Sequence, residues 1–163
     1  CHVALLGRWL DRPTINLGFS GNGKMEPEVA KIIAEINTDL FVIDCLPNMN
    51  EKLVFERMPV FLKTIKAKQP DTPILVVEDR TYANSFFSME RAKTNKSNRE
   101  AFLQVYSMLK KEGVNNVHYL HGNNLLGADG EDTVDGSHPT DLGFYRQAKV
   151  FFPTIQEILL RRE

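Results

Sequence analysis

The chain has 163 residues, with 20 lysines and arginines against 21 aspartates and glutamates. This length suits one domain with a sizeable core, and the near-neutral charge gives no reason to expect nucleic acid or a charged membrane surface as a partner. No apolar run reaches the length of a membrane span. Cys1 and Cys45 make neither a disulfide framework nor a metal site, and we expect Cys45 to be a small buried hydrophobic residue.

Helical and apolar segments alternate in the first third of the chain. The pattern predicts an amphipathic helix over His2–Leu10 and a short strand over residues 14–17 that ends at glycines. Residues 26–36 are expected to form a helix with Pro27 in its first turn. The apolar run at residues 40–44 predicts a strand buried on both faces.

The same alternation continues through the middle of the chain. Glu51–Lys68 is helical in pattern, with Pro59 expected to kink or break the helix. Residues 73–78 predict a third strand, buried on both faces, and residues 81–96 predict an irregular segment over one end of the sheet. Residues 97–100 read Ser-Asn-Arg-Glu, a capping box that predicts the start of a helix ending near Gly113, a residue suited to a helix C-terminus.

The last third predicts one more strand and one more helix. Residues 114–120 indicate a fourth strand, and Thr140 is suited to cap a helix from Asp141 to about Arg161, with a kink at Pro153. Alternating strands and helices favour an α/β domain with a parallel sheet. Ligands bind beyond the carboxyl ends of the strands in such sheets, so we expect the functional residues in the segments that follow the strands.

Asp135-Gly136-Ser137-His138, followed by Pro139, places a carboxylate beside an imidazole on one short loop. This is the orienting half of a nucleophile-His-Asp triad, in which the carboxylate fixes the ring tautomer and stabilises the imidazolium. The alternative is structural: Asp135 starts a turn and His138 precedes a helix.

A phosphate-binding loop is a competing interpretation of the glycine-rich segment near the start of the chain. Gly18, Gly23 and Lys24 fit the pattern G-x-x-x-x-G-K, and Asp44 ends an apolar run as a Walker B carboxylate would. The match fails at Met25, where a hydroxyl should bind Mg²⁺ and a thioether is a poor ligand. A nucleotide-binding protein therefore remains the less favoured alternative.

An anion-stabilising turn is the other functional interpretation of this segment. Gly21 lacks a Cβ, so its backbone N–H can approach a small substrate atom, and Asn48, after the next strand, can donate a second hydrogen bond to an oxyanion. The structural alternatives are that the glycines only turn the chain and that Asn48 or Asn50 caps the following helix. Asn50 suits the capping role better because it directly precedes Glu51.

A glycine after one strand, an asparagine after the next and an Asp-x-x-His near the C-terminus resemble the SGNH (GDSL-type) hydrolases. The resemblance covers nearly the whole chain and is carried by three blocks, NLGFSGNG at residues 16–23, DCLPNM at residues 44–49 and VDGSHPTDLG at residues 134–143. They look like the branch of bacterial acyl-esterases often found in carbohydrate-degrading organisms. The resemblance implies a single domain over residues 1–163 with a flavodoxin-like three-layer α/β/α sandwich and a parallel sheet.

The resemblance also implies roles for four residues. Gly21 and Asn48 match the oxyanion donors, His138 matches the general base and Asp135 matches its partner. The implied activity is serine ester hydrolysis of small acyl esters, with acetylated sugars among the substrates, and no cofactor. The family resemblance alone points to a periplasmic or secreted protein.

The nucleophilic serine belongs to the family's first block, which we expect upstream of Cys1 together with the first strand of the sheet. Ser20 is a weak candidate within the chain, since it lies beside the proposed oxyanion donor, and Ser137 is badly placed for attack beside His138. An SGNH-like binding module that lacks the nucleophile is the alternative from a different functional class.

Several other side chains have a functional and a structural interpretation. Phe86, Phe87 and Met89 could line an acyl or sugar pocket or anchor their loop, and Arg80 could bind substrate or pair with Asp79. In both cases the structural role is favoured.

A histidine pair near the fourth strand gives no metal site. His118 and His121 lie three residues apart, which places them on opposite faces of a strand. We therefore expect no metal there.

Overall fold

The computed structural model describes residues 1–161, which form an α/β fold with a three-stranded parallel sheet. The chain divides into two compact units. One comprises Cys1–Gly18, Arg80–Asn95 and residues 120–161, and the other comprises Phe19–Asp79 and Lys96–Tyr119. No helix within residues 1–161 has the length and apolarity that crossing a membrane requires. The expected α/β class with a parallel sheet is confirmed.

The sheet has the order β1-β2-β3, with β1 at Phe41–Ile43, β2 at Ile74–Val77 and β3 at Val117–Leu120. β1 runs parallel to β2, with Phe41 opposite Ile74. All four residues of β2 are buried, as predicted for a strand covered on both faces. The same prediction for β1 is wrong, because Val42 is 39% exposed at this edge of the sheet.

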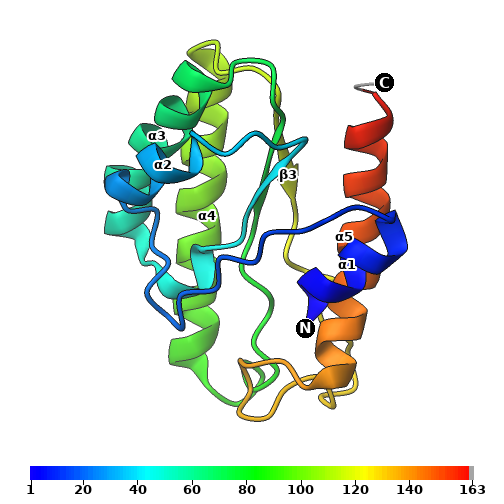
Figure 1. Cartoon of the computed structure of the whole chain (residues 1–163). Helices are drawn as coiled ribbons and strands as arrows, with labels where there is room; N and C mark the ends of the chain where they lie inside the picture. The colour runs from blue at the N-terminus through cyan, green and yellow to red at the C-terminus, as the bar shows by residue number, and fades with distance from the viewer. Residues whose placement is uncertain (162–163) are drawn as a thin grey trace. The chain divides into compact units, whose positions relative to one another are not determined.

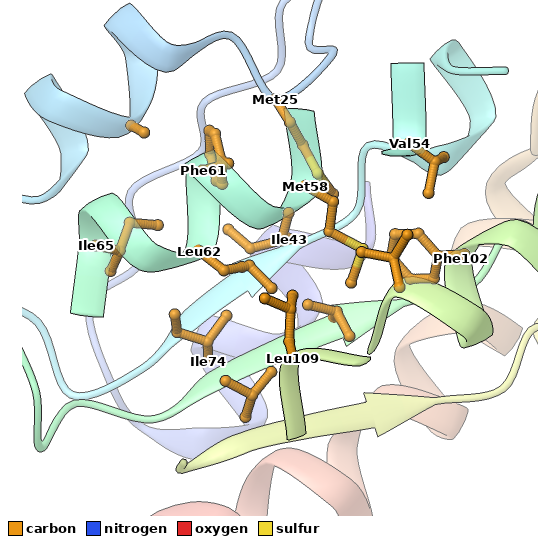
Figure 2. Packing of buried hydrophobic residues seen from close by; sticks show 14 of the residues in the cluster. Met25, Ile43, Val54, Met58, Phe61, Leu62, Ile65, Ile74, Phe102 and Leu109 are labelled. Carbon is orange, nitrogen blue, oxygen red and sulfur yellow. The ribbon is translucent and has the colours of Figure 1, made fainter. Parts of the chain in front are cut away.

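Three helices cover one face of the sheet: α2 at Pro27–Ile33, α3 at Glu51–Lys68 and α4 at Met89–Lys111 (Figure 1). Their apolar side chains share one core with the strands. Figure 2 shows side chains of β1 and β2 among those of α3 and α4: Ile43, Ile74, Met58, Leu62, Phe102 and Leu109. Burial of this apolar surface stabilises the second unit.

α1 (His2–Leu10) packs against α5 (Asp141–Leu160) in the first unit (Figure 1). The Trp9 ring meets the rings of Tyr145 and Phe152 edge-on, with centroids 5.6 and 6.0 Å apart. The predicted cap of α5 is confirmed, since Thr140 Oγ1 accepts the backbone N–H of Gly143 at 3.2 Å. This cap fixes where the chain enters α5 from the preceding loop.

The strand predicted over residues 14–17 is wrong. This segment is exposed and forms no strand in the described part of the chain. A strand needs a neighbouring strand to complete its backbone hydrogen bonds, and the apolar pattern of one segment does not reveal whether such a partner is present.

The start predicted for α4 is also wrong, because the helix begins at Met89 and continues through the apparent capping box at residues 97–100. Asn98, inside this box, is buried, and its Nδ2 donates to the Met49 carbonyl oxygen at 3.1 Å. Asn98 therefore makes a buried tertiary contact from within the helix and does not cap its start.

Two helices contain an internal proline, and neither helix is interrupted by it. α3 continues through Pro59 and α5 continues through Pro153, so the expected break at Pro59 is absent. Met58 and Leu62 beside Pro59 are fully buried. Packing of this face outweighs the single backbone hydrogen bond that a proline removes.

Candidate active site

Asp135 and His138 form a hydrogen-bonded pair, with His138 Nδ1 2.7 Å from Asp135 Oδ2. The other carboxylate oxygen accepts the backbone N–H of His138 at 2.8 Å and that of Ser137 at 2.9 Å. Hydrogen bonds hold the pKa of Asp135 well below its usual range. The His138 backbone N–H has the largest effect, followed by the His138 ring and then the Ser137 backbone N–H. Because the ionised carboxylate can only accept, Nδ1 carries the ring proton and Nε2 is left as the basic nitrogen of the neutral ring.

Two backbone hydrogen bonds close the turn that carries this pair. Val134 N–H donates to the His138 carbonyl oxygen at 2.9 Å, and Thr140 N–H donates to that of Asp132 at 2.8 Å. Gly136, at the tip, has φ +87°, a left-handed conformation that glycine adopts without steric cost. The His138 side chain is 75% exposed, so the ring is open to a substrate.

An ion pair with a buried carboxylate anchors the start of the turn to α5. Arg146 Nη1 lies 2.7 Å from both carboxylate oxygens of Asp132, whose side chain is 1% exposed. Asp132 Oδ2 also accepts the Gly127 N–H at 2.7 Å, and Arg146 Nη2 reaches Asp129 Oδ2 at 2.8 Å. These hydrogen bonds hold the segment before Thr133 on a rigid helix.

Arg80 contacts the same turn, which the sequence did not predict. Arg80 Nε donates to the Ser137 carbonyl oxygen at 2.7 Å, and Nη2 donates to Ser137 Oγ at 3.1 Å. Ala83 N–H donates to the Gly136 carbonyl oxygen at 2.9 Å. The two ends of the Arg80 contact are 57 positions apart, and no local pattern links them.

The glycine loop, residues 19–23, and Asn48 belong to the second unit. Ser20 and Gly21 have φ +50° and +84°, and Asn22 N–H donates to the Phe19 carbonyl oxygen at 3.1 Å, so the chain makes a tight turn of the I′ kind. A Cβ on Gly21 would meet nothing within 4 Å, so the space beside its Cα is open.

Asn48 ends a short 3-10 helix, η1 (Leu46–Asn48), and reaches back to the glycine loop. Its Nδ2 donates to the Gly23 carbonyl oxygen at 3.1 Å. Asn50 caps α3 by accepting the Leu53 N–H at 2.9 Å, as predicted. The predicted cap at Asn50 is therefore confirmed, and the hydrogen bond of Asn48 reaches the loop that contains Gly21.

The residues after the glycine loop do not resemble a nucleotide site. Met25 is 1% exposed within the hydrophobic core, and α2 begins only at Pro27. Lys24 N–H donates to Glu26 Oε2 at 2.8 Å, and Arg57 Nη1 donates to the Lys24 carbonyl oxygen at 3.1 Å. Position 25 thus fills the core and does not face a phosphate-bound cation.

The remaining residues discussed from the sequence are two aromatic residues, a cysteine and possible metal ligands. Phe86 and Phe87 are 87% and 69% exposed and meet edge-on, so they do not anchor their loop as expected. Burial raises the pKa of the Cys45 thiol to about 12, which keeps it protonated and unreactive. Within residues 1–161, no three His, Cys, Asp or Glu side chains gather as a metal site would need.

Residues 1–156 match the family model of the GDSL-like lipase/acylhydrolase family. None of the curated proteins matches the chain. A crystal structure from Bacteroides ovatus ATCC 8483, described as a GDSL-like lipase, is 40% identical with a TM-score of 0.94 over 97% of this chain and 47% of its own.

Two further solved structures share the fold at low sequence identity. The salicylyl-acyltransferase SsfX3 from a tetracycline biosynthetic pathway is 20% identical, with a TM-score of 0.81 over 96% of this chain and 48% of its own. A carbohydrate esterase family 3 protein from Talaromyces cellulolyticus is 11% identical, with a TM-score of 0.67 over 99% of this chain and 92% of its own.

The chain spans about half the length of the Bacteroides ovatus protein and of the acyltransferase. The family model, by contrast, matches nearly all of this chain, and the 40% identity extends over 97% of it. The chain therefore belongs to the GDSL-like lipase/acylhydrolase family.

Proposed function

We propose that the protein that contains this chain is a serine ester hydrolase, with residues 1–163 as a single catalytic domain. The observation that carries the proposal is the 2.7 Å hydrogen bond between Asp135 Oδ2 and His138 Nδ1 on an exposed turn. A carboxylate that holds Nδ1–H leaves Nε2 as the general base for a serine hydroxyl. Membership of an acylhydrolase family makes an ester the natural substrate.

In the proposed reaction, a serine oxygen attacks the ester carbonyl carbon while His138 Nε2 takes the serine proton. The negative oxygen of the tetrahedral intermediate accepts hydrogen bonds from the Gly21 N–H, the Asn48 amide and the serine's own N–H. An amide nitrogen carries two N–H groups, and the Gly23 carbonyl oxygen uses one of those of Asn48. His138 then returns the proton to the leaving alcohol, and water releases the acyl group.

We infer that the nucleophilic serine comes from the family's first sequence block, N-terminal to α1, with Ser20 as the weaker candidate. A fluorophosphonate probe tests this in the full-length natural protein, because an activated serine displaces its fluoride and keeps the phosphonyl group. Peptide mapping should find the label N-terminal to His2, and labelling should fall sharply in the His138→Ala variant. A label on Ser20 would reassign the nucleophile, and a folded protein without label would favour a non-catalytic binding module.

We propose small acyl groups, acetyl on carbohydrates in particular, as the substrate class. The resemblance of the sequence blocks to esterases of carbohydrate-degrading organisms supports this choice, and the carbohydrate esterase from Talaromyces cellulolyticus shares the fold. Acetate release from an acetylated monosaccharide should proceed with a higher kcat/KM than hydrolysis of p-nitrophenyl octanoate. A preference for the octanoyl ester would contradict the proposed acyl group.

A further inference from the structure

The guanidinium group of Arg80 makes two hydrogen bonds to Ser137, in the turn that carries Asp135 and His138. Nε donates to the Ser137 carbonyl oxygen at 2.7 Å, and Nη2 donates to Ser137 Oγ at 3.1 Å. Ser137 immediately precedes His138, and its own N–H donates to Asp135 Oδ1 at 2.9 Å. Arg80 is thus one residue removed from both members of the proposed acid–base pair.

We propose that Arg80 is a positioning residue for ester hydrolysis, which fixes the Ser137 backbone and so the alignment of the His138 ring with the Asp135 carboxylate. The inference rests on the function proposed above. A planar guanidinium with fixed N–H directions suits this role, because it restrains the position and the orientation of what it binds.

The pair needs such a restraint because its own surroundings are open. The side chains of His138 and Asp135 are 75% and 52% exposed, so packing does little to hold them. A hydrogen bond between two exposed side chains contributes little net free energy, because water can bind the same groups. The alignment must therefore come from the turn backbone and from whatever holds that backbone.

The segment that contains Arg80 supports the turn at a second point. Ala83 N–H donates to the Gly136 carbonyl oxygen at 2.9 Å, and a Cβ on Gly136 would lie 2.4 Å from Asn84 Cγ, so the two segments are in close contact. The Arg80 carbonyl oxygen accepts a 2.9 Å hydrogen bond from Asn95 Nδ2 of α4. Arg80 is therefore held by a helix while it holds the turn.

The first test measures kcat and KM for p-nitrophenyl acetate in the full-length natural protein and its Arg80→Ala variant. Misalignment acts on the transition state, so kcat should fall about 10- to 100-fold while KM stays within about twofold. Millimolar guanidinium chloride should restore part of kcat in the variant, and sodium chloride should not. Arg161→Ala is the matched control, since Arg161 directly follows α5, pairs with the exposed Glu157 of that helix, and its removal should leave kcat unchanged.

The second test does not depend on activity. Nitrogen NMR of the His138 ring should show mainly the Nδ1–H tautomer in the natural protein and a smaller fraction of it in Arg80→Ala. A folded Arg80→Ala variant with unchanged kcat and tautomer would overturn the proposal. Loss of the tautomer in a protein without any esterase activity would support the positioning role while it rejects the proposed function.

Ser137→Ala keeps the proposal testable if Arg80→Ala does not fold. This change removes only the 3.1 Å hydrogen bond to Oγ and keeps the 2.7 Å bond to the carbonyl oxygen. A smaller fall in kcat, with a partial loss of the Nδ1–H tautomer, would support the proposal. No change in either quantity would overturn it.

Discussion

A single carboxylate organises the candidate site at the scale of residues. Asp135 accepts hydrogen bonds from the Ser137 and His138 backbone with one oxygen and from the His138 ring with the other. The backbone bonds fix the carboxylate, and the fixed carboxylate fixes the ring. The tautomer that leaves Nε2 basic is therefore a consequence of local turn geometry.

The ionisation of Asp135 gives a prediction about pH. Its folded pKa lies below the ordinary value of 3.8, so the carboxylate stabilises the fold fully above that value and loses this contribution only as pH falls through the lowered pKa. Carbon NMR should find the Asp135 carboxylate still ionised at pH 3.8. In His138→Ala the pKa should move part of the way back, because the ring bond is lost while the backbone bonds remain. An ordinary titration in the natural protein would contradict the observed hydrogen bonds.

Gly136→Ala should damage the turn that carries the pair. The residue has φ +87°, and a Cβ would lie 2.4 Å from Asn84 Cγ. We expect the free energy of unfolding to fall by about 2–3 kcal/mol, from left-handed strain and the displacement of Asn84.

Gly130→Ala is the matched control for this substitution. Gly130 has φ +80°, but a Cβ there would meet nothing within 4 Å. It should therefore cost only the strain, about 1–2 kcal/mol. Urea denaturation of both variants measures the difference, and equal losses would show that the Asn84 side chain moves aside without cost.

At the scale of elements, the loop before α5 is attached to that helix by the ion pair of Asp132 with Arg146. Asp132→Asn removes the charge of a side chain that is 1% exposed and weakens its hydrogen bonds to Arg146 and Gly127. The free energy of unfolding should fall by about 2 kcal/mol. Asp129→Asn, at the exposed end of the same cluster, should cost much less. Urea denaturation compares them, and a larger loss at Asp129 would show that the buried contact is not the anchor.

Helix ends set by nearby capping residues were predictable from the sequence. Elements that depend on contacts between residues far apart in the sequence were not. Thr140 caps α5 and Asn50 caps α3 as expected, because a cap is made by residues three positions apart. The start of α4 was missed because the apparent capping box lies inside the helix, where Asn98 donates to the carbonyl oxygen of Met49, 49 positions away. The strand at residues 14–17 was wrong because its apolar pattern says nothing about a partner strand.

The same distinction applies to the candidate site. The pairing of Asp135 with His138 and the turn at Gly21 follow from short motifs, and the structure contains both. The contact of Arg80 with Ser137 and that of Asn48 with Gly23 join residues 57 and 25 positions apart, so only the folded chain reveals them. For this reason, the contacts that position the reactive residues of a site are harder to predict than the reactive residues themselves.

At the scale of the whole molecule, the family and the α/β fold agree with each other. The family model matches residues 1–156, and the 40% identical structure superposes on 97% of the chain with a TM-score of 0.94. Because many functions share one fold, activity still has to be argued from the site. The Asp135–His138 pair is the part of the site that makes ester hydrolysis the first activity to test.

The most direct measurement compares p-nitrophenyl acetate hydrolysis by the full-length natural protein and by its His138→Ala variant, with the fold of each checked by circular dichroism. We predict hydrolysis above the spontaneous rate, with kcat reduced about 10³- to 10⁶-fold in the variant. Equal activity in the two folded proteins, or none in either, would contradict the assignment of His138 as the general base of an esterase.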